Sequence, residues 1–142
     1  MIGGQVLDLK GEGSDLSRDD LDAIHLAKTG ALIAASVKIG AIAAGAGSSA
    51  VEALGRYGCR IGLAFQIMDD VLDVTGSTDQ LGKTAGRDAA LRKSTYPALL
   101  GVDGAVARAT TLIDEACRDL QSENLLSADL EELAGFIVSR SH

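Results

Sequence analysis

The sequence has little positive charge and few cysteines. Lysine and arginine number 13 against 20 aspartate and glutamate residues, which gives the 142-residue chain a net charge of −7. General nucleic-acid binding requires a basic face for the phosphates, so this composition argues against it. The two cysteines, Cys59 and Cys117, lie far apart and belong to no CxxC pair. We therefore expect reduced thiols and a cytoplasmic protein.

Basic leader sequences and long apolar runs are also scarce. The first residues, MIGGQVLDLKGEG, carry no basic region ahead of an apolar run, so a signal peptide is not expected. The one membrane-like run, Gly30–Gly47, consists mainly of alanine and glycine and is interrupted by Lys38. A spanning helix favours bulkier apolar residues. We expect instead a tightly packed helix of a bundle, and no membrane span.

Aromatic residues make up only 3% of the chain, proline occurs once, and no strand-like alternation is visible. The sequence therefore predicts an all-α fold in a single domain, residues 1–142. The apolar spacing predicts helices over about 18–46, 50–74, 104–122 and 128–139, with Pro97 in the first turn of a short helix. Ser48-Ser49 offers an N-cap, and residues 76–88 form a polar loop. The opening MIGGQVLDL is either a short capping strand or helix, or the middle of something larger.

One of these predicted helices carries a cluster of carboxylates in the stretch FQIMDDVLDV. Asp69 and Asp73 are four residues apart and share a helix face, and Asp70 lies beside them. Like charges at this spacing repel, and burial among apolar neighbours raises the free-energy cost. A solvated acidic face is the simpler alternative, but the flanking residues are almost all apolar. The pattern favours a cation site, and Mg²⁺ binds through one or two carboxylates, waters and substrate phosphates.

Two other cation or phosphate motifs fail on spacing. An EF-hand loop starting at Asp69 would need an acidic residue at Val71 and glycine at Val74. A Walker A loop needs four residues between its glycine and the GK[ST] triplet, whereas five separate Gly76 from Gly82.

Positive residues follow the aspartates within a short span of an otherwise acidic chain. This span holds Lys83, Arg87, Asp88, Arg92 and Lys93, while Lys28-Thr29 lies upstream in HLAKTGAL. Each lysine taken alone is an ordinary surface residue. Together with a Mg²⁺-binding carboxylate cluster, however, the group is suited to grip a diphosphate.

These motifs resemble the trans-isoprenyl diphosphate synthases, the farnesyl and geranylgeranyl diphosphate synthase family. The similarity rests on the DDxxD at Asp69–Asp73 preceded by Phe65-Gln66, on Gly82-Lys83, on Gly86-Arg87-Asp88 and on KSTYPALLG. GGQVLDL and HLAKTGALI agree with it. The resemblance implies an all-α helical bundle of the isoprenoid synthase type. In that bundle an allylic diphosphate is held through Mg²⁺ and its carbocation is attacked by isopentenyl diphosphate.

The resemblance also implies a role for each matching residue. Asp69 would contact the metal directly, and Asp70, Asp73 and Asp88 would order its coordinated water. Lys28 and Lys83 would contact the allylic diphosphate, with Lys93 as a further candidate. Thr29 and Gln66 would line the reacting end and stabilise positive charge. Neutralising a departing diphosphate with metal and lysine agrees with the chemistry of such a step.

The chain departs from the family pattern in one large respect. It has no second DDxxD, because no aspartate follows four places after Asp19 in the segment around Asp19-Asp20. It therefore resembles only the C-terminal half of such a prenyltransferase, and we expect it to be inactive alone. Its expected partner is a second copy in a homodimer or a complementary N-terminal half. Alternatives are a non-catalytic regulatory or dimerisation module of a complete synthase, or a terpene cyclase fragment.

Overall fold

The computed structural model describes residues 2–11, 16–76 and 94–140, and every regular element in these ranges is helical. The elements are α1 (Ile2–Gly11), α2 (Arg18–His25), a π-helical turn η1 (Leu26–Gly30), α3 (Ala31–Ala43), α4 (Ser48–Thr75), α6 (Tyr96–Ser122) and α7 (Ala128–Ser139). The predicted all-α class is confirmed for this part of the chain. The first residues form a helix, α1, which settles the choice between a short strand and a helix.

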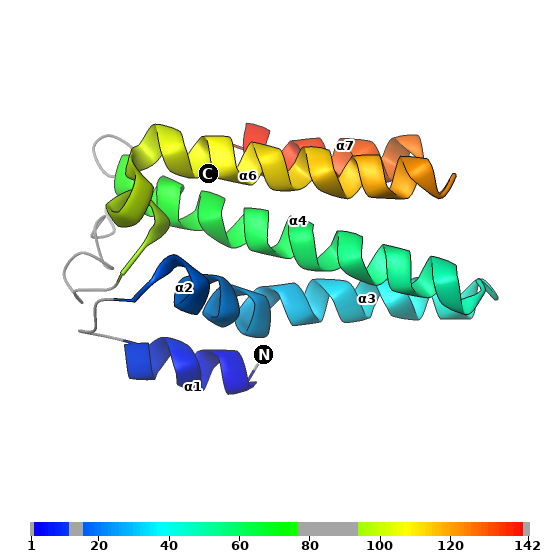
Figure 1. Ribbon diagram of the computed structural model, residues 1–142, viewed down its shortest axis with the longest axis horizontal. Coiled ribbons are helices and arrows are strands. Elements are labelled where there is room, and N and C mark those ends of the chain that lie inside the picture. The colour runs from blue at the N-terminus through cyan, green and yellow to red at the C-terminus, as the bar shows by residue number, and fades with distance from the viewer. Residues whose placement is uncertain (1, 12–15, 77–93, 141–142) are drawn as a thin grey trace.

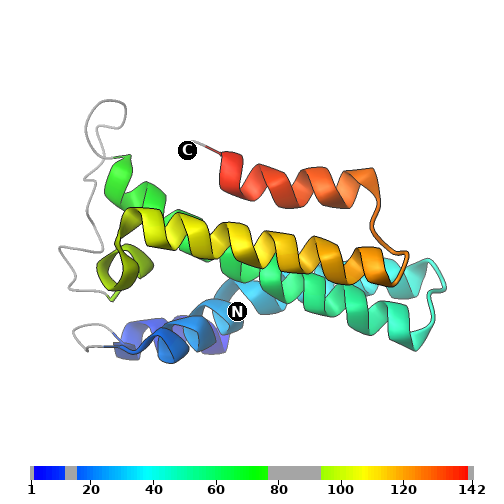
Figure 2. The same cartoon turned by 45° about the horizontal axis from the view of Figure 1, so that its top comes forward.

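Helix α4 is the central element. Figure 1 shows it lying between α3 on one side and α6 with α7 on the other, and in the rotated view of Figure 2 it passes behind α6. Its fully buried side chains include Tyr57, Ile61, Ala64 and Ile67. They pack against buried residues of α6 such as Leu112 in one continuous apolar core. A helix that is apolar around most of its surface belongs in a bundle interior.

Small residues bring α3 and α4 into backbone contact. A Cβ added to Gly58 would lie 2.6 Å from the Cα of Ala34, and one added to Gly62 would lie 2.6 Å from the Cα of Gly30. The tight packing predicted for the run of alanine and glycine is therefore present along this seam. The opposite side of α3 is exposed at Leu32, Ile39 and Ile42.

By length and composition alone, one run among the described residues, Arg18–Ala43, is apolar enough to cross a membrane. The core helix of a soluble protein meets the same criterion. The absence of a membrane span stays a prediction.

The helix predicted over 18–46 is not one regular α-helix. The N–H of Ala31 donates to the carbonyl of Leu26, five residues back, so the chain makes a π turn between α2 and α3. The regular helix then ends at Ala43. The predicted serine cap is also wrong, because α4 begins at Ser48 itself and its N-cap is Gly47, which has no side chain to accept a hydrogen bond.

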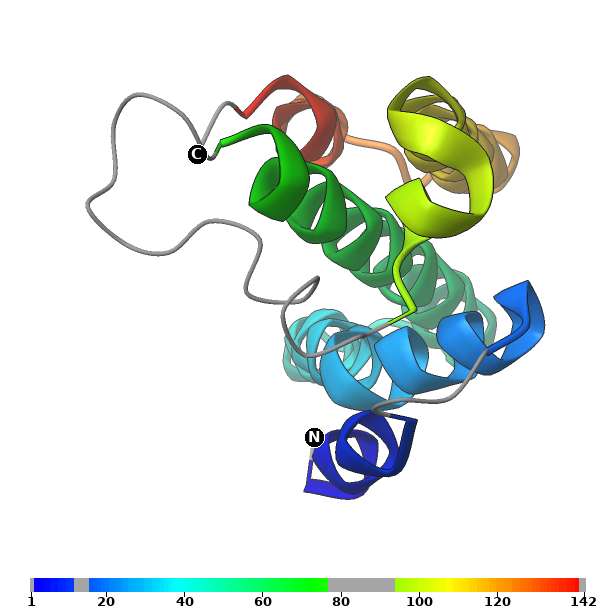
Figure 3. The same ribbon diagram turned by 90° about the vertical axis from the view of Figure 1, so that its left-hand side faces the viewer.

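Helix α6 begins as predicted with Pro97 in its first turn. The N-cap is Thr95, whose hydroxyl accepts from the N–H of Ala98 at 3.4 Å. Gly101 has φ 73° and ψ 166°, a conformation that favours glycine, and it separates a short first segment from the long remainder. Viewed from the end in Figure 3, this first segment lies beside the C-terminal end of α4. At the start of this segment, the backbone N–H of Tyr96 donates to the carboxylate of Asp70.

Candidate functional site

A pocket of about 350 Å³ lies at the C-terminal end of α4. It is lined by residues of α2, η1, α4 and the segment leading into α6: Leu21, His25, Lys28, Thr29, Gln66, Asp69, Asp70, Asp73, Ser94 and Thr95. Six of the predicted site residues therefore share one pocket: Lys28, Thr29, Gln66, Asp69, Asp70 and Asp73. The other three, Lys83, Asp88 and Lys93, lie outside the described residues.

The π turn determines how Lys28 and Thr29 reach this pocket. Both residues lie within Leu26–Gly30, directly after α2 and opposite the carboxylates of α4. On the other side of the turn α1 approaches so closely that a Cβ on Gly4 would lie 2.3 Å from the backbone nitrogen of Lys28. The turn is thus backed by α1 and packed on α4, which fixes the direction from which the lysine enters.

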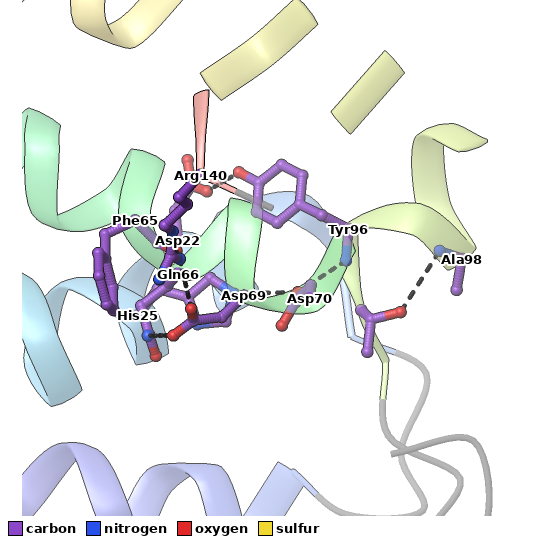
Figure 4. Close-up of polar contacts among 10 residues, drawn as sticks. Asp22, His25, Phe65, Gln66, Asp69, Asp70, Tyr96, Ala98 and Arg140 are labelled. Carbon is purple, nitrogen blue, oxygen red and sulfur yellow. Dashed lines mark hydrogen bonds and ion pairs between the residues drawn. The ribbon is translucent and has the colours of Figure 1, made fainter. Parts of the chain in front are cut away.

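Asp69 is the half-exposed carboxylate of the cluster. Its Oδ2 accepts from Gln66 Nε2 at 2.8 Å, and its Oδ1 pairs with the guanidinium of Arg140, as Figure 4 shows. Partial burial raises the pKa of Asp69, and the neighbouring Arg140 offsets only part of that rise. A carboxylate desolvated in this way gains more from an added cation than a fully hydrated one.

Arg140, at the C-terminal end of α7, is a member of the site that sequence reasoning missed. Its guanidinium lies 3.9 Å from the centroid of the Phe65 ring and donates to the Phe65 carbonyl at 2.9 Å. The side chain is only 11% exposed. Arg140 and Asp69 are 71 residues apart. No local signal marks such a pair, since it exists only once α7 has folded back along α4.

Asp70 is the buried carboxylate of the cluster. Its Oδ2 accepts from the backbone N–H of Tyr96 at 3.0 Å and lies 3.3 Å from Nε2 of His25. His25 entered the sequence prediction only as part of the HLAKTGALI motif. Tyr96 entered only as part of KSTYP, and its main-chain contact could not be read from the sequence.

The side chains of this pocket suit a cation that is bound partly by protein carboxylates and partly by substrate phosphates. In the described ranges, no three histidine, cysteine, aspartate or glutamate side chains are close enough to enclose a metal ion. A closed protein cage is therefore not formed by this part of the chain. Mg²⁺ instead uses one or two carboxylates and keeps waters and substrate phosphates in its remaining positions. Asp69 and Asp73, facing a lysine across a polar pocket, fit that arrangement.

Comparison with known proteins identifies the fold. The family model described as polyprenyl synthetase matches residues 1–133. This chain belongs to the polyprenyl synthetase family. It is 49% identical over 145 residues to the farnesyl diphosphate synthase of Escherichia coli, covering 99% of this chain and 48% of that protein.

Solved structures of this family agree. The chain superposes on a polyprenyl synthase from Caulobacter crescentus, complexed with calcium and isoprenyl diphosphate, with a TM-score of 0.87 and 31% identity, over 99% of this chain and 56% of that one. It also superposes on a geranyltransferase from Helicobacter pylori, complexed with magnesium and isoprenyl diphosphate, with a TM-score of 0.78 and 34% identity, over 98% and 46% of the two chains. The predicted all-helical isoprenoid synthase type is confirmed. The chain spans about half the length of these relatives.

Proposed function

We propose that this chain supplies one half of the active site of a Mg²⁺-dependent prenyltransferase. The complete enzyme would condense isopentenyl diphosphate with an allylic diphosphate to give a longer polyprenyl diphosphate. The observation that carries the proposal is the pocket in which Asp69, Asp70 and Asp73 of α4 face Lys28 and Thr29 of the π turn. The two structural relatives that are complexed with a divalent cation and isoprenyl diphosphate support it.

Each residue has a task in this proposal. Asp69 would contact Mg²⁺ directly and Asp70 and Asp73 would order its coordinated water, and the cation would neutralise charge on the allylic diphosphate. Lys28 and Lys83 neutralise the diphosphate oxygens, with Lys93 as a further contact, and Asp88 orders a coordinated water. Thr29 and Gln66 place polar oxygens near the allylic carbon. Positive groups already in place where negative charge develops on the leaving diphosphate lower the barrier to its departure.

The proposed binding of metal and diphosphate is tested by adding Mg²⁺ and inorganic diphosphate to the chain and measuring the shift in its melting temperature. At a ligand concentration of 100 Kd the folded state gains about 2.7 kcal/mol, equivalent to roughly 5–10 °C. Asp69→Ala should remove most of this shift. Asp114→Ala is the matched control, because Asp114 is exposed on α6 and does not line the pocket. A full shift in Asp69→Ala would contradict the site.

The catalytic half is tested by complementation. We propose that the chain alone does not turn over, and that it acts in the cytoplasm as a homodimer or with a complementary N-terminal half. Mixing it with the remaining half of the Escherichia coli relative, expressed as a separate chain, should restore formation of a longer prenyl diphosphate. A chain that binds tightly to a complete synthase and never supports turnover would instead be a regulatory module.

A further inference from the structure

Three elements meet at the carboxylate of Asp70. The residue belongs to α4, and its Oδ2 receives the N–H of Tyr96 at the start of α6 and faces Nε2 of His25 at the end of α2. Its side chain is 12% exposed, against 42% for the neighbouring Asp69. Of the two carboxylates, Asp70 is therefore the one held inside the protein, with a single oxygen engaged by two groups.

The two groups that hold Asp70 also hold each other. The rings of His25 and Tyr96 are stacked, with centroids 6.0 Å apart and planes inclined by 20°. The Tyr96 hydroxyl donates to the carboxylate of Asp22, which lies one helical turn before His25 on α2. The contacts thus close a ring, from Asp22 along α2 to His25, across to Asp70, on to Tyr96 and back (Figure 4).

His25 contributes to this ring through one defined nitrogen. To donate to Asp70, Nε2 must carry the proton, and the other nitrogen, Nδ1, is buried without a hydrogen-bond partner among the described residues. Burying an unpartnered polar atom is unfavourable, so packing alone would favour an apolar side chain here. A histidine at this position is explained by what Nε2 does for Asp70.

We propose that His25 and Tyr96 are positioning residues that fix Asp70, and through it the last turns of α4, in the geometry that receives the metal and diphosphate. This inference rests on the proposed function. With Oδ2 engaged by two groups, Asp70 has only Oδ1 left for the pocket side. Groups that orient ligands from behind commonly change metal affinity 10- to 100-fold when they are removed.

The test uses two substitutions of similar size, His25→Gln and His25→Asn. The side-chain amide nitrogen of glutamine can reach the position of Nε2, whereas that of asparagine falls near Nδ1. Binding of Mn²⁺ in the presence of inorganic diphosphate is followed by the loss of the free-ion electron paramagnetic resonance signal. We expect His25→Gln to bind within about twofold of the unaltered chain and His25→Asn to bind about tenfold more weakly. Equal affinities for the two variants would overturn the proposal.

A second readout needs no metal and separates this inference from the proposed function. If the unaltered chain does not bind Mn²⁺ and diphosphate, the proposed function fails, and the positioning role is decided by hydrogen exchange of the Tyr96 amide. A carboxylate that is held in place should protect that amide, so we expect its exchange to be about tenfold faster in His25→Asn than in His25→Gln. Equal exchange rates would overturn the positioning role.

Discussion

The first half of α4, up to Gly62, approaches α3 closely through its glycines, whereas the last turns, from Phe65 onward, carry two carboxylates that are held by hydrogen bonds and ion pairs. In the first half, Gly58 and Gly62 let α3 approach until an added carbon would touch its backbone. In the last turns, Asp69 and Asp70 are held by Arg140, Tyr96 and His25, which come from three other elements. The first half gains stability from close contact with α3, and the last turns hold partly desolvated charge.

The largest expected effect comes from adding a side chain at Gly58, in the closely packed first half of α4. Gly58→Val would place its Cβ 2.6 Å from the Cα of Ala34, so α3 and α4 must move apart. We expect a loss of about 3 kcal/mol and a melting temperature lower by about 10 °C. Gly40→Ala on α3 is the control, because a Cβ there meets nothing within 4 Å, and it should stabilise by up to about 1 kcal/mol. Calorimetry of both variants decides whether the seam is as close as described.

A smaller effect, dependent on pH, concerns the one phenol in the packed half. Tyr57 is fully buried and its hydroxyl donates to the carbonyl of Leu130 at 2.6 Å. Burial raises the pKa of Tyr57 to about 12. Below about pH 10 the hydroxyl is neutral in both the folded and the unfolded chain, so its contribution to stability is complete. Between about pH 10 and 12 the unfolded chain ionises first, and stability falls as the pH rises.

Tyr57→Phe should reduce the loss of unfolding free energy at alkaline pH by roughly 2 kcal/mol. It should also lower the unfolding free energy at neutral pH by about 1 kcal/mol, because the hydrogen bond to Leu130 is lost. Urea unfolding at pH 8 and at pH 11.5 measures both quantities. Burial also raises the pKa of Tyr96, which contributes to the slope of both proteins, so the difference between the two proteins isolates Tyr57. Parallel slopes would mean that the phenol is not buried in the folded chain.

The smallest effect tests the charged half. Arg140 pairs with Oδ1 of Asp69, the carboxylate proposed to contact the cation. Arg140→Gln removes a positive group that competes with the metal for Asp69. It should therefore strengthen binding of Mn²⁺ alone by about threefold, because charges this close interact strongly in a partly desolvated site. Arg118→Gln, an exposed change on α6, is the control and should leave the affinity unchanged. Weaker binding in Arg140→Gln would show that the arginine supports the site.

The sequence predicted the elements that repeat locally and missed the contacts that depend on folding. The amphipathic spacing predicted α4, α6 and α7, and the spacing of Asp69 and Asp73 predicted a cluster on one face. The π turn at Leu26–Gly30 has no local signature, since it depends on α1 behind it and α4 in front. Arg140 was invisible for the same reason, because it meets Asp69 only after the intervening helices have packed.

The π turn also has a consequence for how this chain can vary. A regular helix advances about 100° per residue, so one additional residue in a turn rotates everything that follows by that angle. Deleting a single residue within Leu26–Gly30 would leave α2 and α3 individually intact but change their phase. His25 could then face the carboxylates, or Gly30 and Ala34 could face α4, but not both. The π turn therefore lets α2 direct His25 toward the aspartates while α3 directs its small residues toward α4.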